Sequence, residues 1–293
     1  MSSQPSILAE ITPHARVLTF ALEPGADPRP ALVRIAKLIE GWQVVVGLGA
    51  PLVALLGAKI EGLRSFPALT GVGVAFPSTQ AALWVSLTGS DRGEILDRAL
   101  AFGKALGEGF RLEEEVDCFK YRKGHDLTGF EDGTENPKDQ LAIEAAIVSG
   151  KGPGLDGSSF VAVQRYKHDL IRFEALDVHA RGNVIGRSFE SNEELEEAAA
   201  SAHVKRSAQE SFDPPAFMVR RSMPWGGAGE HGLYFVAYGE SLDRFERVLS
   251  RMAGRDDGVV DALLSFTRAL SGGYYWCPPL HEGRLDLRAL DTR

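Results

Sequence analysis

The sequence predicts an α+β protein that contains two copies of one strand-and-helix unit. Apolar runs typical of strands are mixed with amphipathic segments without strict alternation, which favours antiparallel sheets with helices on one face. Two segments, LWVSLTGSDRGEILDRAL from Leu83 and LYFVAYGESLDRFERVLS from Leu233, share one pattern. Each has an aromatic-bearing strand, a turn and a helix containing Asp-Arg. The Gly-rich stretch 149–159 separates them and predicts domains at 1–148 and 149–293.

In the first half, β-branched and aromatic runs predict strands at 15–22, 43–49, 81–87 and 119–123. A helix is expected from Pro28 or Pro30 to Trp42, because proline is tolerated in the first helical turn. The stretch Thr88–Asp91 supplies a turn and an N-cap for a helix over 92–106.

In the second half, strands are expected at 159–166 and 233–238, with helices opening at 171–176 and covering 242–252. The strongly acidic stretch NEELEEAAAS, residues 192–201, reads as helical. It stands directly before His203 in the sequence.

Composition places the chain among ordinary globular proteins. It has 293 residues, of which 44% are hydrophobic and 25% charged, enough for one large domain or two of middling size. A formal net charge of −8 argues against binding to nucleic acid or anionic membranes. No apolar run approaches the roughly 20 residues of a membrane span. The start lacks a basic region followed by an apolar core, so no signal peptide is expected and the cytoplasm is the predicted location.

Several common kinds of site have no support in the sequence. The seven histidines form no HExxH or other close metal pair, which argues against a zinc enzyme. The two cysteines, Cys118 and Cys277, form neither a disulfide framework nor a CxxC motif. There is no GxSxG elbow, no P-loop and no GxGxxG after a strand.

Three other segments concentrate residues that could carry chemistry. They are GFEDGTENP (Gly129–Pro137), AHVKR (Ala202–Arg206) and VRRSMPWGG (Val219–Gly227). Taken singly, each has a plain structural interpretation. Asp132 is typical of a turn, His203 of an exposed polar position, and Arg220 and Arg221 of surface ion pairs. Spacing alone does not specify a reaction.

In this order, the three segments resemble the dye-decolourising peroxidase family, specifically class B of the DyP-type haem peroxidases. GFEDGTENP is similar to the family's GxxDG signature, AHVKR to the segment with the proximal haem ligand, and VRRSMPWG to the segment with the distal arginine. SFTRALSGGYYWCPP (Ser265–Pro279) resembles the family's C-terminal strand region. The resemblance covers about 15–290. It implies two tandem ferredoxin-like domains and one haem b per chain, bound mainly by the C-terminal half.

The resemblance also implies a ligand for the haem iron. His203 would be this metal ligand, and a carboxylate on its far ring nitrogen would make the imidazole more basic. Asp261 is the candidate carboxylate, with an ordinary helix-surface acid as the alternative. Some relatives have a further acid four residues later, where this chain has Ser265.

On the peroxide side, the resemblance implies three catalytic residues. Asp132 would move a proton, directly or through one water. Arg220 would stabilise the developing anionic oxygen with its fixed fork of donors. Ser222 stands where some class B members have Asn, and a hydroxyl is the shorter donor.

Further cofactor contacts are implied around these residues. Phe130, Gly133 and Thr134 belong to the loop expected over the haem, although Phe130 could simply be packed in its loop. Arg187 in VIGRSFE would pair with a propionate, with a surface ion pair as the alternative. Aromatic residues that could relay electrons to the surface are Trp225, Tyr274, Tyr275 and Trp276.

The implied activity is reduction of hydrogen peroxide to water through a ferryl intermediate, with dyes, phenols or similar one-electron donors oxidised. Two alternatives stand beside it: a haem- or porphyrin-handling protein with little peroxide turnover, and a haem-free ferredoxin-like module. A homo-oligomer is expected because oligomers are common in the family. Packaging in a protein nanocompartment is not expected, because the sequence stops soon after HEGRLDLRALDTR.

Overall fold

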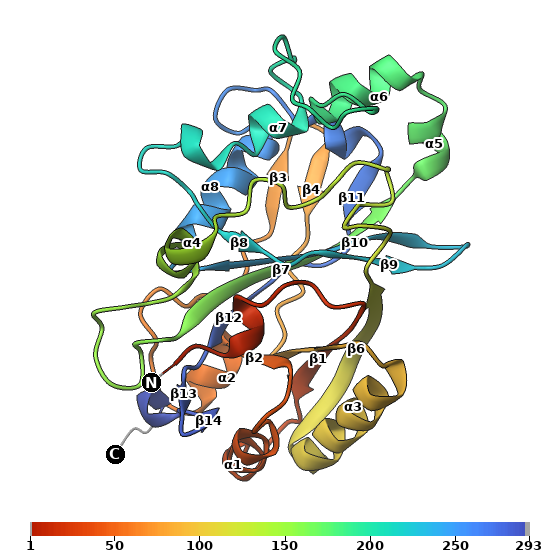
Figure 1. Ribbon diagram of the computed structural model, residues 1–293. Coiled ribbons are helices and arrows are strands. Elements are labelled where there is room, and N and C mark those ends of the chain that lie inside the picture. Colours follow the sequence, from red (N-terminus) through yellow and green to blue (C-terminus); the bar gives the residue numbers. More distant parts are fainter. Residues whose placement is uncertain (1, 291–293) are drawn as a thin grey trace.

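The computed structural model describes residues 2–290 and contains antiparallel sheet and helices (Figure 1). The first half provides four long strands: β1 (His14–Leu22), β2 (Val44–Gly49), β5 (Leu83–Gly89) and β6 (Phe110–Phe119). They pair in the order β2-β5-β1-β6, and every pair is antiparallel. Helices α1 (Arg29–Leu38) and α3 (Arg92–Leu106) pack together and lie against their outer face.

The second half repeats this arrangement with β7 (Ser159–His168), β9 (Met223–Gly226), β10 (His231–Gly239) and β12 (Gly273–Cys277). These strands pair in the order β12-β7-β10-β9, again antiparallel. Helix α8 (Asp243–Met252) packs on the outer face of β10. The similar segments at Leu83 and Leu233 therefore form β5 with α3 and β10 with α8. When the second strand order is read backwards, as β9-β10-β7-β12, β10 holds the place that β5 holds in β2-β5-β1-β6.

The two sets of strands join into one closed sheet. Strand β12 pairs with β2, and β6 pairs with β9 at Cys118 and Trp225. Two short strands extend the sheet: β8 (Val219–Arg220) beside β10, and β11 (Thr267–Ala269) beside β7. Because side chains alternate across a strand, one face of each strand fills the interior of the closed sheet. This interior is apolar and includes Val17, Trp84, Val161, Tyr234 and Tyr275.

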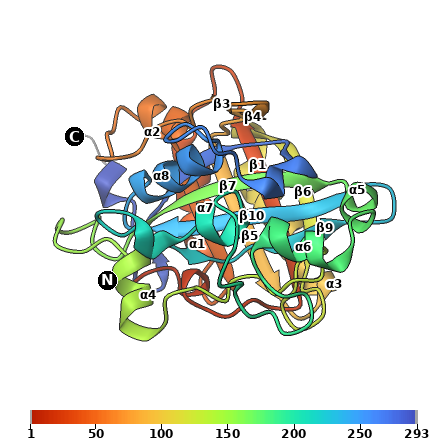
Figure 2. The same cartoon turned by 90° about the horizontal axis from the view of Figure 1, so that it is seen from above.

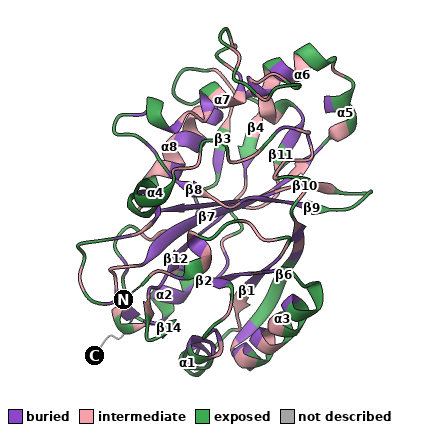
Figure 3. Cartoon of the chain, viewed as in Figure 1, coloured by how far each residue is buried: buried purple, intermediate pink, exposed green. Residues whose placement is uncertain are grey.

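The remaining elements are short. The α-helices among them are α2 (Ala50–Leu55), α4 (Asp139–Ala146), α5 (Leu170–Glu174), α6 (Val178–Ile185) and α7 (His203–Arg206). The strands are β3 (Leu69–Gly71), β4 (Val74–Phe76), β13 (Leu280–His281) and β14 (Arg284–Leu285), and the 3₁₀ turns are Pro5–Ile7, Gly107–Gly109, Gln209–Ser211, Ala262–Ser265 and Arg288–Leu290. Helices α5, α6, α7 and α8 all lie above β7 and β10 in Figure 1, and the view from above in Figure 2 shows them spread across these strands. The strands are largely buried, whereas helices show one buried and one exposed face (Figure 3).

Most expected elements are confirmed to within a few residues. The helix predicted over 92–106 has those bounds, and Asp91 caps it by accepting from the Glu94 amide at 3.0 Å. The helix expected to reach Trp42 ends at Leu38 and is followed by Gly41 with φ +75°. The antiparallel strands and covering helices agree with an α+β class. Among residues 2–290, no helix has the length and apolar character needed to cross a bilayer.

Two local predictions were wrong. The strand expected at 119–123 lies earlier, at 110–119, where charged residues on its exposed face hid the pattern. The acidic stretch 192–201 contains turns and one isolated bridge instead of a helix. It has one large apolar residue, Leu195, so it offers no apolar face to pack, and short helices need such packing to be stable.

Candidate active site

A cavity lies on the outer face of β7 and β10, beneath α8 and α7. Strand alternation explains its position: Leu233 and Phe235 of β10 face this cavity, while Tyr234 and Val236 face the interior of the closed sheet. Its apolar walls are Met218, Leu233, Phe235, Phe245, Val248, Leu249, Met252 and Leu263, and its polar members include Asp132, His203 and Arg220. We call it the site cavity.

His203 is the first residue of α7 and is held by Asp261. Its Nδ1 lies 2.8 Å from Asp261 Oδ2, and the Asp261 side chain is completely buried. The other carboxylate oxygen accepts from the Leu263 amide at 2.9 Å. Burial lowers the pKa of His203, but the adjacent carboxylate outweighs it, so the pKa is raised overall. Asp261 is thus an acceptor for the His203 ring and not a surface acid.

Helix α7 is only four residues long, and Arg206 at its end anchors it. The buried Arg206 guanidinium donates to both carboxylate oxygens of Asp257, at 2.7 and 2.8 Å. It also donates to the Arg251 carbonyl at 2.6 and 3.2 Å. These bonds tie the histidine-bearing turn to the end of α8 and the segment that follows it.

Asp132 and Arg220 line the same cavity as His203. Burial raises the pKa of Asp132, and the positive charge of Arg220 opposes this only in part. The Arg220 Nε is buried and has no hydrogen-bond partner among the described residues. A carboxyl group of raised pKa beside a fixed cation is suited to exchanging a proton with a small molecule while the cation stabilises negative charge.

The loop 129–137 also contains Asn136, whose role the sequence did not reveal. Its Oδ1 accepts from the Arg220 amide at 2.7 Å, and its Nδ2 donates to the Arg220 carbonyl at 3.1 Å. In sequence, Asn before Pro is an ordinary turn residue. The partner lies 84 positions away, so only the fold brings the two together.

The other predicted catalytic residue, Ser222, lies next to the site cavity and not in it. Ser222 is 5% exposed, and its Oγ accepts from the Val236 amide at 3.3 Å. It lines a neighbouring open pocket together with Asp132, His125 and Lys123. Asp132 therefore faces both spaces.

The expected cofactor contacts occupy different surroundings. Phe130 is 4% exposed and packs with Phe173, Ile185 and Phe266. Gly133 has φ +76° in the turn after Asp132.

Thr134 is exposed. Arg187 is not among the residues that line the site cavity. It donates to Glu135 of the same loop at 2.9 Å and to the Asn192 carbonyl at 2.9 Å.

Strand β7 contributes polar residues that sequence reasoning missed. Gln164, Tyr166 and His168 point to the site cavity, and their alternate spacing on a predicted strand was the available signal. The Tyr166 hydroxyl donates to Gln164 Oε1 at 2.8 Å, while Gln164 Nε2 has no partner among residues 2–290. An apolar cavity with unpartnered buried donors and one histidine held by a carboxylate fits a large, flat, mostly apolar cofactor that carries a metal and anionic groups.

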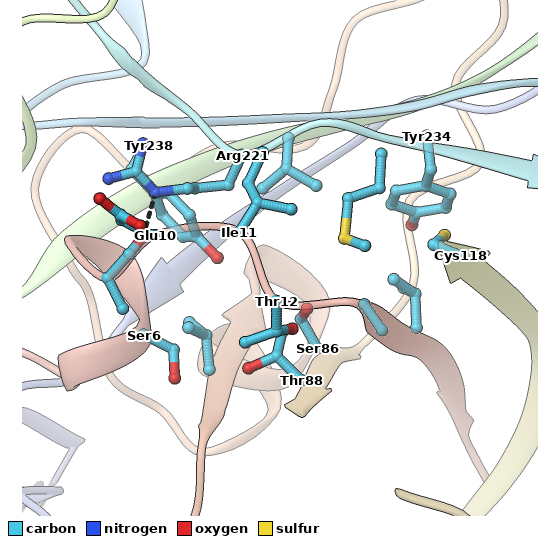
Figure 4. Close-up of a pocket in the computed structure, with 16 residues that line it drawn as sticks. Ser6, Glu10, Ile11, Thr12, Ser86, Thr88, Cys118, Arg221, Tyr234 and Tyr238 are labelled. Carbon is cyan, nitrogen blue, oxygen red and sulfur yellow. Dashed lines mark hydrogen bonds between the residues drawn. The ribbon is translucent and has the colours of Figure 1, made fainter. Parts of the chain in front are cut away.

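A second cavity lies inside the closed sheet and belongs to a different part of the fold (Figure 4). Tyr234 and Tyr238 line it, together with Cys118 and Arg221. None of the predicted site residues reaches it. The residues considered as electron relays are buried as well, with Trp225 at 7% the most exposed of them.

A histidine hydrogen-bonded to a carboxylate shares one apolar cavity with an acid and an arginine, an arrangement that suits the chemistry of a haem peroxidase. The family model described as Dyp-type peroxidase, C-terminal, matches residues 123–282, more than half of the chain. A dye-decolorizing peroxidase from Mycobacterium tuberculosis is 32% identical over 299 residues, covering 96% of this chain and 89% of the relative. The chain belongs to the DyP-type peroxidase family.

Solved structures agree with this assignment. A variant of DypB from Rhodococcus jostii in complex with heme has a TM-score of 0.85 and 26% identity, covering 93% of this chain and 95% of that one. The encapsulated DyP-type peroxidase from Mycobacterium smegmatis has a TM-score of 0.85 and 26% identity, covering 95% and 96%.

Proposed function

We propose that this peroxidase binds one haem b in the site cavity and reduces hydrogen peroxide to water while oxidising dyes, phenols or similar donors. The observation that carries the proposal is that His203 with its Asp261 partner shares one apolar cavity with Asp132 and Arg220. The relatives' name and the heme-bound neighbour support both the reaction and the cofactor. When bound, the haem supplies the two electrons that divide the O–O bond and recovers them from the donor.

The residues of the chain would handle the protons and the charge. Asp132 as a carboxylate accepts a proton from one oxygen of hydrogen peroxide. It returns this proton to the other oxygen, which leaves as water. Arg220 donates to this leaving oxygen while negative charge develops on it. Loss of such a preorganised donor costs about 100- to 1,000-fold in rate.

His203 would hold the iron through Nε2. Its Nδ1–H donates to Asp261, which fixes the ring orientation and makes the imidazole a stronger electron donor. The burial of Asp261 and its second bond to the Leu263 amide keep this carboxylate in place.

The surrounding residues take supporting roles in the proposal. Phe130, Gly133 and Thr134 contribute the loop that covers the haem. Arg187 would release the exposed Glu135 carboxylate and pair with a propionate of the haem instead. Ser222 helps to order water in the pocket that it shares with Asp132.

We also propose that residues 1–148 and 149–293 are two ferredoxin-like units, of which 1 and 291–293 lie outside the described residues. The matching orders β2-β5-β1-β6 and β9-β10-β7-β12 support this division. Assignment to class B rests on the three motif segments. A cytoplasmic location and a homo-oligomer remain predictions. Nanocompartment packaging is described for one neighbour and is not proposed for this chain.

The test is the visible spectrum of haemin-reconstituted protein before and after one equivalent of peroxide, with Asp132→Ala, Arg220→Ala and His203→Ala beside the parent. The exposed His179→Ala serves as the control. The parent should show a Soret band that responds to peroxide. Asp132→Ala or Arg220→Ala should slow this response about 100-fold or more. His203→Ala should change haem ligation.

Other outcomes separate the alternatives. A stable haem band that ignores peroxide would favour the porphyrin-handling function. Absence of a haem band would favour the haem-free module. Unchanged kinetics in both distal variants would remove Asp132 and Arg220 from the mechanism.

A further inference from the structure

The side chain of Asn136 forms a two-bond bridge to the backbone of Arg220. Its Oδ1 accepts from the Arg220 amide at 2.7 Å, and its Nδ2 donates to the Arg220 carbonyl at 3.1 Å. The placement of oxygen and nitrogen is fixed by chemistry, because a backbone N–H only donates and a carbonyl only accepts. One amide thus imitates the pairing of a neighbouring strand at the edge of β8.

The same bridge connects the two residues assigned to peroxide chemistry. Asp132 stands four positions before Asn136. Their loop is closed by the backbone N–H of Asn136, which donates to the Gly133 carbonyl at 3.1 Å. The Asp132 amide donates to the Gly124 carbonyl at 3.0 Å. On the other side, Arg220 is paired with Ala237 of β10. The loop and the sheet therefore meet through Asn136.

The absence of a side chain at Gly133 allows the Asn136 side chain to lie close to the turn. A Cβ at Gly133 would lie 2.9 Å from Asn136 Nδ2, and φ there is +76°. Any larger residue would both strain the turn and push the amide away from Arg220. The glycine of the loop thus leaves room for the asparagine.

We propose that Asn136 is a positioning residue that sets the placement of Arg220 relative to Asp132, and so the rate of reaction with peroxide. This inference rests on the proposed function for its kinetic consequence, but the bridge itself is a property of the fold. Positional errors of about 1 Å in a catalytic group cost up to roughly 100-fold in rate.

The experiment compares holoenzyme carrying Asn136→Ala or Asn136→Asp with the parent. Asn183→Asp, at an exposed position of α6, is the matched control. Asn136→Ala removes both bonds and should slow the peroxide reaction about 10- to 100-fold at every pH. Asn136→Asp keeps the acceptor. The introduced carboxyl regains the donor only when protonated, so its rate relative to the parent should rise as the pH falls.

Two readouts do not depend on turnover. Hydrogen exchange of the Arg220 amide should accelerate in Asn136→Ala and stay slow in Asn136→Asp, where an oxygen still accepts. Cyanide affinity of the ferric holoenzyme should fall in Asn136→Ala, because Arg220 no longer faces the bound anion. Thermal unfolding of each variant shows whether the fold is kept.

The outcomes separate this inference from the proposed function. Asn136→Ala that folds and keeps parental exchange, cyanide affinity and peroxide rate would overturn it, as would an Asn136→Asp rate ratio that does not change with pH. If Asp132→Ala and Arg220→Ala also react with peroxide normally, the roles proposed for Asp132 and Arg220 fail, and if the parent holoenzyme does not react with peroxide, the proposed function fails. Faster exchange at Arg220 in Asn136→Ala would then still support the bridge.

Discussion

Asp132 illustrates how a residue can be unfavourable for stability and suited to chemistry. Burial raises the pKa of its carboxyl group, and Arg220 compensates only in part. A group whose folded-state pKa is raised contributes most to stability below its unfolded-state pKa of about 3.9, and this contribution is lost as the pH rises through the folded-state value. At neutral pH the ionised carboxylate therefore lowers the stability of the folded protein.

Asp132→Asn should consequently unfold at a higher temperature than the parent at pH 7, and the difference should shrink under acidic conditions. The same change should slow the peroxide reaction, since an amide accepts no proton. Scanning calorimetry of both proteins at neutral and acidic pH, with stopped-flow kinetics in parallel, checks the two effects together. A variant less stable at pH 7 would contradict the assigned cost of the buried charge.

Arg220 should also affect the pH below which the peroxide reaction slows, because it lowers the pKa of Asp132. Its positive charge lowers the pKa of Asp132, so Arg220→Leu should raise that pKa. The reaction needs the carboxylate, so the rate falls as the pH drops through this pKa. The acid limb of the peroxide reaction should move to higher pH in the variant, in addition to a loss of about 100- to 1,000-fold. An acid limb at unchanged pH would show that another group controls it.

At the scale of elements, α7 is too short to hold itself in place. Short helices are marginal in water, so its position depends on the buried Arg206 and its partners. The hydrogen bonds from Arg206 hold the pKa of Asp257 at about 2. A carboxyl group with a lowered folded-state pKa stabilises the fold fully above its unfolded-state pKa of about 3.9. This stabilisation is lost as the pH falls toward about 2. The anchor therefore persists across the neutral range.

Arg206→Met should weaken haem binding, although Arg206 does not line the site cavity. The variant retains an apolar stem but loses the bonds to Asp257 and Arg251, so His203 is less well placed. Haem affinity should fall about 10-fold, and the melting temperature should fall too. Lys205→Met is the control, because Lys205 and its partner Glu194 are both exposed. Equal haem affinity in the two variants would mean that α7 does not depend on its anchor.

How much of each element the sequence predicts depends on how its apolar residues are arranged. The helix at 92–106 has an N-cap and a periodic face, and its bounds were predicted correctly. Strand β6 was misplaced because charged side chains occupy its exposed face, which weakens the apolar signal. The acidic stretch 192–201 was expected to be helical from residue propensity, and without an apolar face tertiary packing does not support it. Local signals therefore succeed where an element packs by a regular face.

For the site, sequence motifs supplied His203, Asp132 and Arg220, but not what connects them. The resemblance named Asp261 as the candidate partner of His203 across 58 positions, whereas nothing in the sequence indicated the bridge between Asn136 and Arg220, which are 84 positions apart. No local pattern encodes such contacts, because they arise when strands and loops from distant segments meet. Gln164 and His168 became site residues only because the outer face of β7 forms a cavity wall.

At the scale of the whole molecule, the two halves share their apolar interior. Val17 and Trp84 from the first half and Val161 and Tyr275 from the second belong to one buried cluster. Either half alone would expose this face and two unpaired strand edges, which is unfavourable. The division at 149–159 is therefore compatible with a molecule whose halves depend on each other.

The haem-free chain should consequently unfold in one cooperative transition, even when the seam between its halves is disturbed. A Cβ at Gly47 would lie 2.7 Å from Tyr275 Cβ across the seam of β2 and β12, so Gly47→Ala should destabilise by about 1–3 kcal/mol. Gly103→Ala is the matched control. It lies in α3 with no atom within 4 Å of the added Cβ, and should be neutral or stabilising by up to about 1 kcal/mol.

Calorimetry gives the answer, because a two-state transition has equal calorimetric and van't Hoff enthalpies. One transition that shifts to lower temperature in Gly47→Ala means that both halves unfold as a unit. Two transitions, of which one alone responds to Gly47→Ala, would show halves that fold independently and a closed sheet that contributes little to their stability.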